Sequence, residues 1–168
     1  MKKVAVFGKP GSGKSTLSKL LAYKTGLPLY QLDSMLYTKD GAFVDRNEFD
    51  AKHEEVLKSD CWIMDGFGPI GSFYKRLEEA DTLIYIDLPY ITSYWFVTKR
   101  LLKSVFVKPE GWPDGSSAIK GTLASYKVLK LCPKFWNKEF SGKLQLMSAA
   151  KSVHIIKSVN ELSNAEFL

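Results

Sequence analysis

The stretch Gly8-Lys9-Pro10-Gly11-Ser12-Gly13-Lys14-Ser15-Thr16 decides the fold of this chain. It matches the pattern G-x-x-x-x-G-K-[ST], in which glycines let the backbone bend around a polyphosphate. The apolar run 3–7 before it predicts a buried strand, and residues 17–22 after it predict a helix. A strand, a glycine-rich loop and a helix in this order form the context in which the pattern binds phosphate. The sequence therefore predicts that residues 8–16 bind a nucleoside triphosphate.

The pattern also assigns roles within this loop. Its main-chain N–H groups and the N-terminus of the following helix are expected to bind the phosphates. We expect the Lys14 ammonium to contact the β- and γ-phosphates and the Ser15 hydroxyl to ligate Mg²⁺. The alternative is a glycine-rich turn that binds nothing, and the flanking strand and helix argue against it. A dinucleotide fingerprint needs a different order of glycines. The predicted nucleotide-binding residues are Gly8, Pro10, Gly11, Ser12, Gly13, Lys14, Ser15 and Thr16.

The composition fits one compact domain spanning residues 1–168. Of the 168 residues, 45% are hydrophobic and 25% are charged, as in ordinary globular proteins. We expect no signal peptide, because only five apolar residues precede the loop. We expect no membrane span either, because charged residues and Pro89 interrupt the apolar run 83–107. Cys61 and Cys132 lack metal-type spacing, which predicts a reduced, cytoplasmic setting.

Two aspartates follow predicted strands. Asp33 comes after the apolar run 29–32, and Asp65 comes after the run 61–64. In open α/β sheets, the carboxyl ends of the strands face the ligand crevice. An acidic residue about fifty positions past the phosphate loop is the usual second Mg²⁺-handling group, so we expect Asp65 to have this role. For Asp33 four roles are open: coordination of Mg²⁺ through water, binding of a substrate hydroxyl, general base, or cap of the next turn.

The remaining pattern predicts further strands and helices. Residues 34–47 are loop-like with a turn at 40–41, and a polar helix 46–59 has Phe49, Val56 and Leu57 as its apolar stripe. We expect His53 on this helix to be solvated, and the segment 34–59 to cover an acceptor substrate. The other predicted elements are strands 82–86 and 153–156, helices 73–80, 91–106, 117–131 and 138–151, and a capped turn that starts at Ser158. Five strands alternating with helices predict an α/β fold with a parallel sheet covered on both faces.

Positive charge is concentrated in one part of the chain. The net charge is +6, and residues 99–143 contain ten basic but only three acidic residues. This basic segment is a solvated lysine-rich face, a phosphate-closing lid at about 99–120, or a nucleic-acid patch. The predicted helix 91–106 has Lys99, Arg100 and Lys103 on the side opposite an apolar stripe made of Ile91, Trp95, Leu102 and Phe106. The aromatic residues of the segment, which we expect to be mostly core, are Trp112, Tyr126, Phe135 and Trp136.

The chain resembles the adenylate kinase and shikimate kinase group of P-loop proteins in four motifs: Gly8 to Thr16, Leu32-Asp33, Trp62 to Phe67, and Ile86 to Pro89. More closely, nearly its full length resembles the bacterial DNA topology modulation proteins, a small family of predicted ATPases similar to adenylate kinases. The region around Trp136 and the ending Phe167-Leu168 are part of this resemblance. It implies the three-layer α/β/α fold of P-loop NTPases with sheet order 2-3-1-4-5, and ATP bound by Gly11 to Thr16.

The chain departs from adenylate kinases at the acceptor site. Those enzymes follow Asp-Gly-Phe with Pro-Arg, whose arginine holds the acceptor phosphate, whereas this chain has Gly68-Pro69. Lys75 or Arg76 is the nearest replacement. Arg100 matches the place of a lid arginine, and the Pro/Gly stretch 107–115 is shorter than a full lid. The sequence therefore disfavours an adenylate kinase activity on this scaffold.

Three functions are open at this point. The preferred one is an ATP-dependent phosphotransferase that uses Mg²⁺ and moves the γ-phosphoryl group to a small acceptor, such as a nucleotide or nucleoside. Its predicted catalytic residues are Lys14, Asp33, Asp65 and Arg100, and its predicted metal ligands are Ser15 and Asp65. The second is a regulatory ATPase that engages nucleic acid through the basic segment, as the name of the resembling family suggests. The third is a nucleotide-binding module without chemistry.

Overall fold

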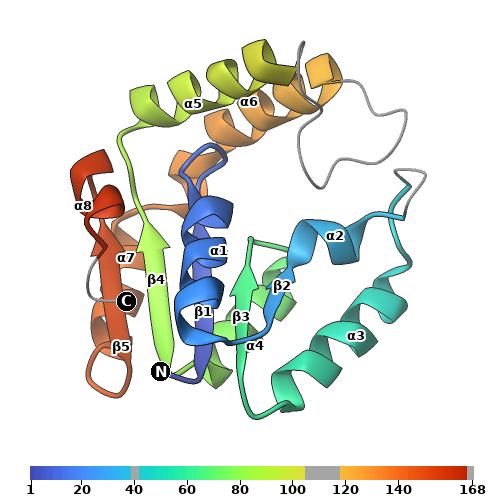
Figure 1. The fold of residues 1–168 in the computed structure, drawn as a ribbon, viewed down its shortest axis with the longest axis vertical. Coiled ribbons are helices and arrows are strands. Elements are labelled where there is room, and N and C mark those ends of the chain that lie inside the picture. The colour runs from blue at the N-terminus through green and yellow to red at the C-terminus, as the bar shows by residue number, and fades with distance from the viewer. Residues whose placement is uncertain (39–41, 105–117, 166–168) are drawn as a thin grey trace.

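The computed structural model describes residues 1–38, 42–104 and 118–165. Within them, the strands are β1 (Lys3–Gly8), β2 (Leu29–Gln31), β3 (Trp62–Asp65), β4 (Thr82–Ile86) and β5 (Ser152–Ile156). All neighbours in the sheet are parallel, and the strand order is β2-β3-β1-β4-β5 (Figure 1). The predicted α/β fold and its sheet order are therefore confirmed, and each predicted strand begins and ends within one residue of its expected position.

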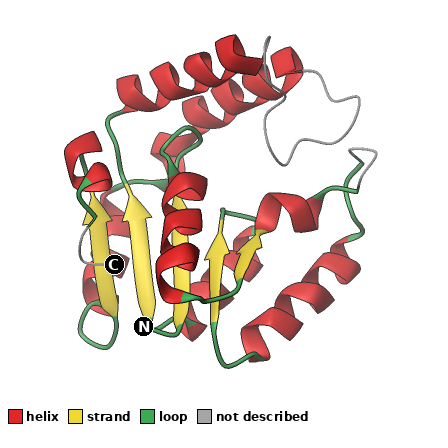
Figure 2. Ribbon diagram, in the orientation of Figure 1, coloured by secondary structure: helices red, strands yellow, loops and turns green. Residues whose placement is uncertain are grey.

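Helices connect the strands and cover both faces of the sheet (Figure 2). They are α1 (Lys14–Thr25), α2 (Leu32–Leu36), α3 (Arg46–Lys58), α4 (Ile70–Glu79), α5 (Tyr90–Ser104), α6 (Ala118–Phe135), α7 (Lys138–Met147) and α8 (Val159–Ser163). In Figure 1, α5 and α6 lie side by side beyond the carboxyl ends of the strands, above the loop that joins β1 to α1. The α5–α6 pair is therefore at the edge of the sheet where the sequence predicts the ligand site.

Successive side chains of each central strand enter two different cores, one on each face of the sheet. The first core joins strand residues to α1 and α8, and its members include Val4, Val6, Leu17, Leu21, Ile63, Ile84 and Ile156. The second joins strand residues to α3, α4 and α7, and its members include Phe7, Val56, Trp62, Met64, Phe73, Tyr85 and Phe140. Because both faces are buried, the strands are nearly continuous apolar runs, and the architecture has three layers.

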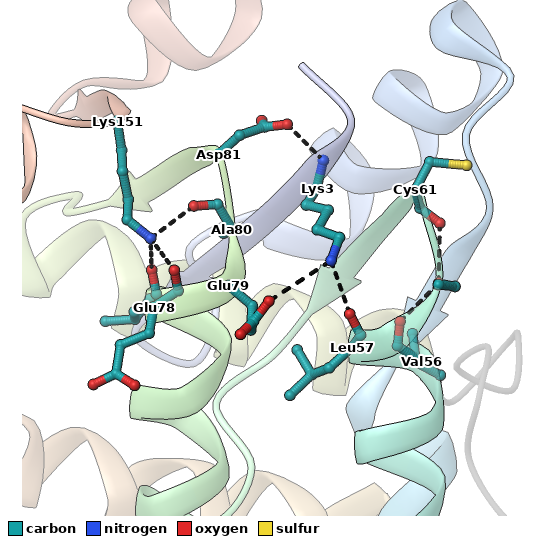
Figure 3. Close-up of polar contacts among 11 residues, drawn as sticks. Lys3, Val56, Leu57, Cys61, Glu78, Glu79, Ala80, Asp81 and Lys151 are labelled. Carbon is teal, nitrogen blue, oxygen red and sulfur yellow. Dashed lines mark hydrogen bonds and ion pairs between the residues drawn. The ribbon is translucent and has the colours of Figure 1, made fainter.

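Charged side chains fix the amino edge of the sheet (Figure 3), which lies at the opposite end of the strands from the phosphate loop (Figure 1). The Asp81 carboxylate accepts a hydrogen bond from the main-chain N–H of Lys3 at 3.0 Å. The Lys151 ammonium donates to the carbonyl oxygens of Leu77 and Ala80 at 2.8 and 2.9 Å, where α4 ends. A lysine at a helix C-terminus satisfies carbonyl groups that the helix itself leaves unpaired. These contacts tie the starts of β1, β4 and β5 to α4.

The predicted loop 34–47 contains a short helix instead. Helix α2 runs from Leu32 to Leu36. Leu32 is completely buried, and the Ser34 hydroxyl donates to the Gln31 carbonyl oxygen at 2.7 Å. Burial of one leucine and a local hydrogen bond thus stabilise a helix that is too short to produce a periodic sequence pattern.

The prediction of a solvated His53 is wrong. His53 lies in α3 and is 1% exposed, and its ring stacks on that of Phe49 with 5.7 Å between centroids. Phe49, Val56 and Leu57 are buried, which confirms the predicted apolar stripe of this helix. His53 completes the same stripe, because a residue four positions after Phe49 lies on the same face of a helix.

The apolar stripe predicted for α5 does not face a core. Ile91, Trp95 and Leu102 are 77%, 58% and 59% exposed, whereas the buried residues of the helix are Ser93 and Val97. Helix α5 packs mainly against α6 and the phosphate loop, and Phe96 adds a contact with the first core, so the buried face of the helix is narrow. An apolar stripe indicates that a face can be buried, and the tertiary arrangement decides whether it is.

Two other helices end away from their predicted limits. Helix α6 continues through Pro133 to Phe135, where the sequence predicted an end at 131. Cys132 is buried and Phe135 packs against the second core, so tertiary contacts extend the helix past the proline. Helix α7 ends at Met147 and not at 151. The predictions for the turn at 40–41, Phe106, the Pro/Gly stretch 107–115, Trp112 and Phe167-Leu168 concern residues outside those that the structure describes.

No helix within the described ranges has both the length and the apolar character needed to cross a membrane. The two cysteines, Cys61 and Cys132, are both free thiols.

Candidate functional site

The loop of residues 8–16 joins β1 to α1, as the motif predicts. Gly8, Gly11 and Gly13 have φ angles of 149°, 69° and 85°, which side-chain-bearing residues rarely adopt. At Gly11 a side chain would also collide with α5, because an added Cβ would lie 2.5 Å from the Ser93 carbonyl oxygen. Glycine is therefore required at position 11 by both the backbone conformation and the close approach of α5.

The N-terminus of α1 lacks the groups that usually satisfy such a helix end. No side chain caps it at Gly13, and its first turn contains no acidic residue. The Ser12 hydroxyl in front of it is buried without a hydrogen-bond partner. Uncapped N–H donors at the positive end of the helix dipole favour an anion at this place. The local geometry therefore fits the phosphate site that the sequence predicts.

Lys14 is the centre of the charged cluster at this loop. Its ammonium donates to the Lys9 carbonyl oxygen at 2.8 Å. Burial lowers the pKa of Lys14, the carboxylates of Asp65 and Asp33 act in the opposite direction, and Arg100 lowers it further. The charges of Asp33, Asp65 and Arg100, from α2, β3 and α5, thus all act on the Lys14 ammonium of α1.

Asp65 has the features expected of a metal-handling carboxylate. It ends β3, is 4% exposed, and its Oδ1 is buried without a hydrogen-bond partner. Burial raises the pKa of Asp65, whereas the charge of Lys14 and hydrogen bonds from Ser15 and Gln31 lower it. The hydrogen bond places the Ser15 hydroxyl beside this carboxylate, so the two predicted Mg²⁺ ligands are neighbours.

The donor set around Asp65 matches the way Mg²⁺ is bound with nucleotides. Among the residues that the structure describes, no group of three or more His, Cys, Asp or Glu side chains could hold a metal ion. Mg²⁺ is commonly held by one or two carboxylates together with substrate phosphates and water, so it does not need such a group. The unpartnered Asp65 oxygen beside Ser15 therefore fits Mg²⁺ better than it fits a structural transition metal.

Asp33 and Arg100 approach the loop from the helices that flank it. Asp33 lies in the first turn of α2 and is exposed. The Arg100 guanidinium donates to the Ser125 hydroxyl of α6 at 3.0 Å. Burial lowers the pKa of Arg100 and the Asp33 carboxylate raises it, which places these opposite charges near each other. Arg100 therefore connects the α5–α6 pair to the predicted acceptor side of the site.

The glycine-rich turn after Asp65 is held by a buried arginine. The Arg76 guanidinium donates to the carbonyl oxygens of Gly66 and Phe67 at 2.8 and 3.2 Å, and Arg76 is completely buried. Lys75, the other predicted replacement for an acceptor-binding arginine, forms an ion pair with Glu54 of α3. Arg76 therefore holds the main chain of the turn in place from the protein interior, and Lys75 links α4 to α3.

A group of residues to which the sequence assigned no role in the site lies behind the phosphate loop. Lys9, which the motif leaves unspecified, forms an ion pair with Asp87 at the end of β4 and lies 4.7 Å from the centroid of the Tyr90 ring. Two sequence signals pointed to Asp87: it lies in the Ile86-to-Pro89 motif of the resemblance, and it follows a predicted strand directly, as Asp33 and Asp65 do.

Comparisons with known proteins give a likeness of fold. No family model matches the chain, and no curated protein sequence matches it. A shikimate kinase from Acinetobacter baumannii, solved with shikimate, aligns over 100% of this chain and 96% of that one, with 14% identity and a TM-score of 0.53. A sugar kinase from a Janibacter species aligns over 94% and 85% of the two chains, with 15% identity and a TM-score of 0.48. A shikimate kinase from Bacteroides thetaiotaomicron aligns over 89% and 83%, with 16% identity and a TM-score of 0.46.

At these identities the likeness concerns the fold alone. A parallel sheet with the order β2-β3-β1-β4-β5, aligned over the full chain with a shikimate kinase, is the arrangement of the adenylate- and shikimate-kinase-like proteins. The chain therefore has the α/β fold of the P-loop kinases.

Proposed function

We propose that this chain is an ATP-binding P-loop phosphotransferase, which transfers the γ-phosphoryl group to a small acceptor in a Mg²⁺-dependent reaction. One observation carries the proposal. Lys14, Asp33, Asp65 and Arg100 come from four separate elements, and the charges of the other three act on Lys14 at the uncapped N-terminus of α1. Salt bridges that only stabilise a fold rarely bring two cations and two carboxylates to a helix N-terminus whose N–H donors are free to bind an anion.

The phosphate loop supplies binding and charge neutralisation. Residues 8–16 and the first turn of α1 offer main-chain donors to the phosphates, and Lys14 adds a positive charge at the β- and γ-phosphates. Ser15 and Asp65 would hold Mg²⁺, which supplies further neutralisation of the phosphate oxygens when bound. Phosphoryl transfer needs positioning and charge stabilisation more than covalent chemistry, and this loop provides both.

The acceptor is proposed to bind between the glycine turn and the helices α2 and α3. Segment 34–59 forms the proposed cover, and the turn at Gly66, held by Arg76, allows close approach of a substrate. Asp33 or Asp65 would orient the acceptor hydroxyl, and Arg100 would stabilise the equatorial oxygens during transfer. Because Arg100 extends from α5, we further propose that the segment 99–120 acts as a short basic lid.

The second candidate is a regulatory ATPase that engages nucleic acid through the basic segment, in keeping with the predicted resemblance to the DNA topology modulation proteins. Exposed lysines on α5 and α6 favour it. The aromatic side chains described between residues 118 and 143 do not, because stacking on bases needs free rings. The Tyr126 hydroxyl hydrogen-bonds with Thr98 at 2.6 Å, and Phe135 and Trp136 pack against the second core. This packing favours the phosphotransferase.

An assay of the purified chain with MgATP and a panel of nucleotides, nucleosides and small hydroxyl compounds tests the choice. A phosphotransferase gives a phosphorylated acceptor, and Lys14→Ala lowers turnover or ATP affinity by about tenfold or more. The matched control is Lys24→Ala, which removes one exposed lysine from the other end of the same helix and leaves both values unchanged. Steady ATP hydrolysis without transfer to any acceptor would support the ATPase instead, and DNA binding that weakens steeply with salt would support its nucleic-acid role.

A further inference from the structure

Lys9 is a buried cation inside the phosphate loop. It is 1% exposed, whereas most lysines are solvated. Its ammonium pairs with the Asp87 carboxylate and lies over the ring of Tyr90, the first residue of α5. A buried charge is stable only when it has partners, and these two contacts supply a counter-charge and a cation–π interaction. The Lys9 side chain is therefore held between β4 and α5.

The partner of Lys9 is itself firmly placed. The Asp87 main-chain N–H donates to the Ile156 carbonyl oxygen at 2.8 Å. This contact joins the residue that follows β4 to the end of β5, inside a sheet where β4 lies between β1 and β5. The position of the Lys9 ammonium is thus set by the rigid part of the fold.

The main chain of Lys9 faces the reaction site. Its carbonyl oxygen accepts a hydrogen bond from the Lys14 ammonium at 2.8 Å and another from the Ser12 main-chain N–H at 3.3 Å. The carbonyl that orients Lys14 therefore belongs to the residue whose side chain is fixed behind the loop. If that anchor is lost, the carbonyl can shift, and the Lys14 ammonium is free to turn to the carboxylates of Asp65 and Asp33.

We propose that Lys9 is a positioning residue for nucleotide binding, which acts by holding its own carbonyl oxygen under the Lys14 ammonium. This inference rests on the proposed ATP-binding function. The two partners of the Lys9–Asp87 ion pair differ in exposure, which distinguishes it from an ion pair that is purely structural. The Asp87 side chain is 38% exposed, so water can solvate it when Lys9 is replaced by an apolar residue of similar length. The variant Lys9→Met should therefore fold, with its defect confined to the loop.

The test is a double-variant cycle measured as the dissociation constant of MgATP by calorimetry. We expect Lys9→Met to weaken MgATP binding about five- to tenfold, which is near the upper end of the value of an ordinary hydrogen bond. In a Lys14→Met background, we expect the same substitution to have no further effect, because the group through which Lys9 acts is gone. The matched control is Lys24→Met, which removes one lysine charge from an exposed site and should leave binding unchanged.

A second variant covers the case in which Lys9→Met fails to fold. Tyr90→Leu removes the ring beneath the Lys9 ammonium and keeps the ion pair, so it should weaken MgATP binding less, and again only when Lys14 is present. Equal losses with and without Lys14 would overturn the proposal, because Lys9 would then act on the phosphates directly. Unchanged binding in both variants would overturn it as well. A wild-type chain that binds no MgATP would instead remove the proposed function, and this inference with it.

Discussion

The sharpest prediction concerns Gly11, where the loop meets α5. We expect Gly11→Ala to lower the free energy of unfolding by two separate effects. The first is the backbone conformation, because φ is +69° and a side-chain-bearing residue loses about 1–2 kcal/mol there. The second is steric, because the new Cβ would lie 2.5 Å from the Ser93 carbonyl oxygen and 2.8 Å from the Val97 Cγ2 atom. A main-chain oxygen cannot rotate away, so overpacking adds about 1–3 kcal/mol.

Gly26 provides a matched control for the first effect. It caps the C-terminus of α1 with φ of +70°, and a Cβ added there would meet no atom within 4 Å. Gly26→Ala should therefore lose only the conformational contribution of about 1–2 kcal/mol. The difference between the two variants isolates the contact between the loop and α5, and we expect it to be about 1–3 kcal/mol in favour of Gly26→Ala.

Urea unfolding of both variants measures these values, and calorimetry with MgATP measures the effect on the loop. We expect Gly26→Ala to bind MgATP as the wild type does, and Gly11→Ala to bind it at least about tenfold more weakly, since the loop donors can no longer converge. Equal losses of stability in the two variants would show that α5 does not press on the loop. If Gly11→Ala bound MgATP with wild-type affinity, the proposed convergence of the loop donors on the phosphates would be wrong.

Two further predictions concern α3. Burial lowers the pKa of His53 to about 4, so between the ordinary value of 6.5 and about 4 the unfolded chain binds a proton that the folded chain does not. The free energy of unfolding should therefore decrease by up to about 3 kcal/mol as the pH falls through this window, and His53→Leu should remove most of that slope in urea titrations at pH 4 to 7. Asp45 accepts a hydrogen bond from the Asn47 main-chain N–H at 2.8 Å, so Asp45→Ala should lower the free energy of unfolding by about 1 kcal/mol, whereas Asp45→Asn should retain most of it. A slope that persists in His53→Leu, or an Asp45→Ala variant as stable as the wild type, would contradict these assignments.

The sheet and the loop were predictable because their signals are local. Each strand is a short apolar run, and the run before Gly8 together with the helix after it places the motif without knowledge of the rest of the chain. Asp65 could be found in the same way, since parallel strands end at one edge and it follows an apolar run directly. The confirmed strand positions show that burial on both faces produces a pattern that survives in a single sequence.

The features that were missed depend on distant parts of the chain. Lys9 and Asp87 are 78 positions apart, and nothing near either residue indicates that one is the counter-charge of the other. His53 is a polar residue on a polar helix, and only the packing of Phe49 beside it shows that it is buried. The exposure of the apolar stripe of α5 could not be predicted either, because an apolar stripe has the same appearance in the sequence whether or not it is covered.

These distant contacts have one consequence for the site. The phosphate loop touches α5 at two points, through Gly11 against Ser93 and through Lys9 against Tyr90, and α5 also carries Arg100. A rotation or shift of α5 must therefore change the shape of the loop and the position of Arg100 together, since both contacts are close-packed or buried. The converse also follows, because binding at the loop selects the positions of α5 that keep these contacts. Under the proposed function, charge neutralisation at the phosphates by Lys14 and by Arg100 would thus be coupled through the fold, although the two residues are 86 positions apart in the sequence.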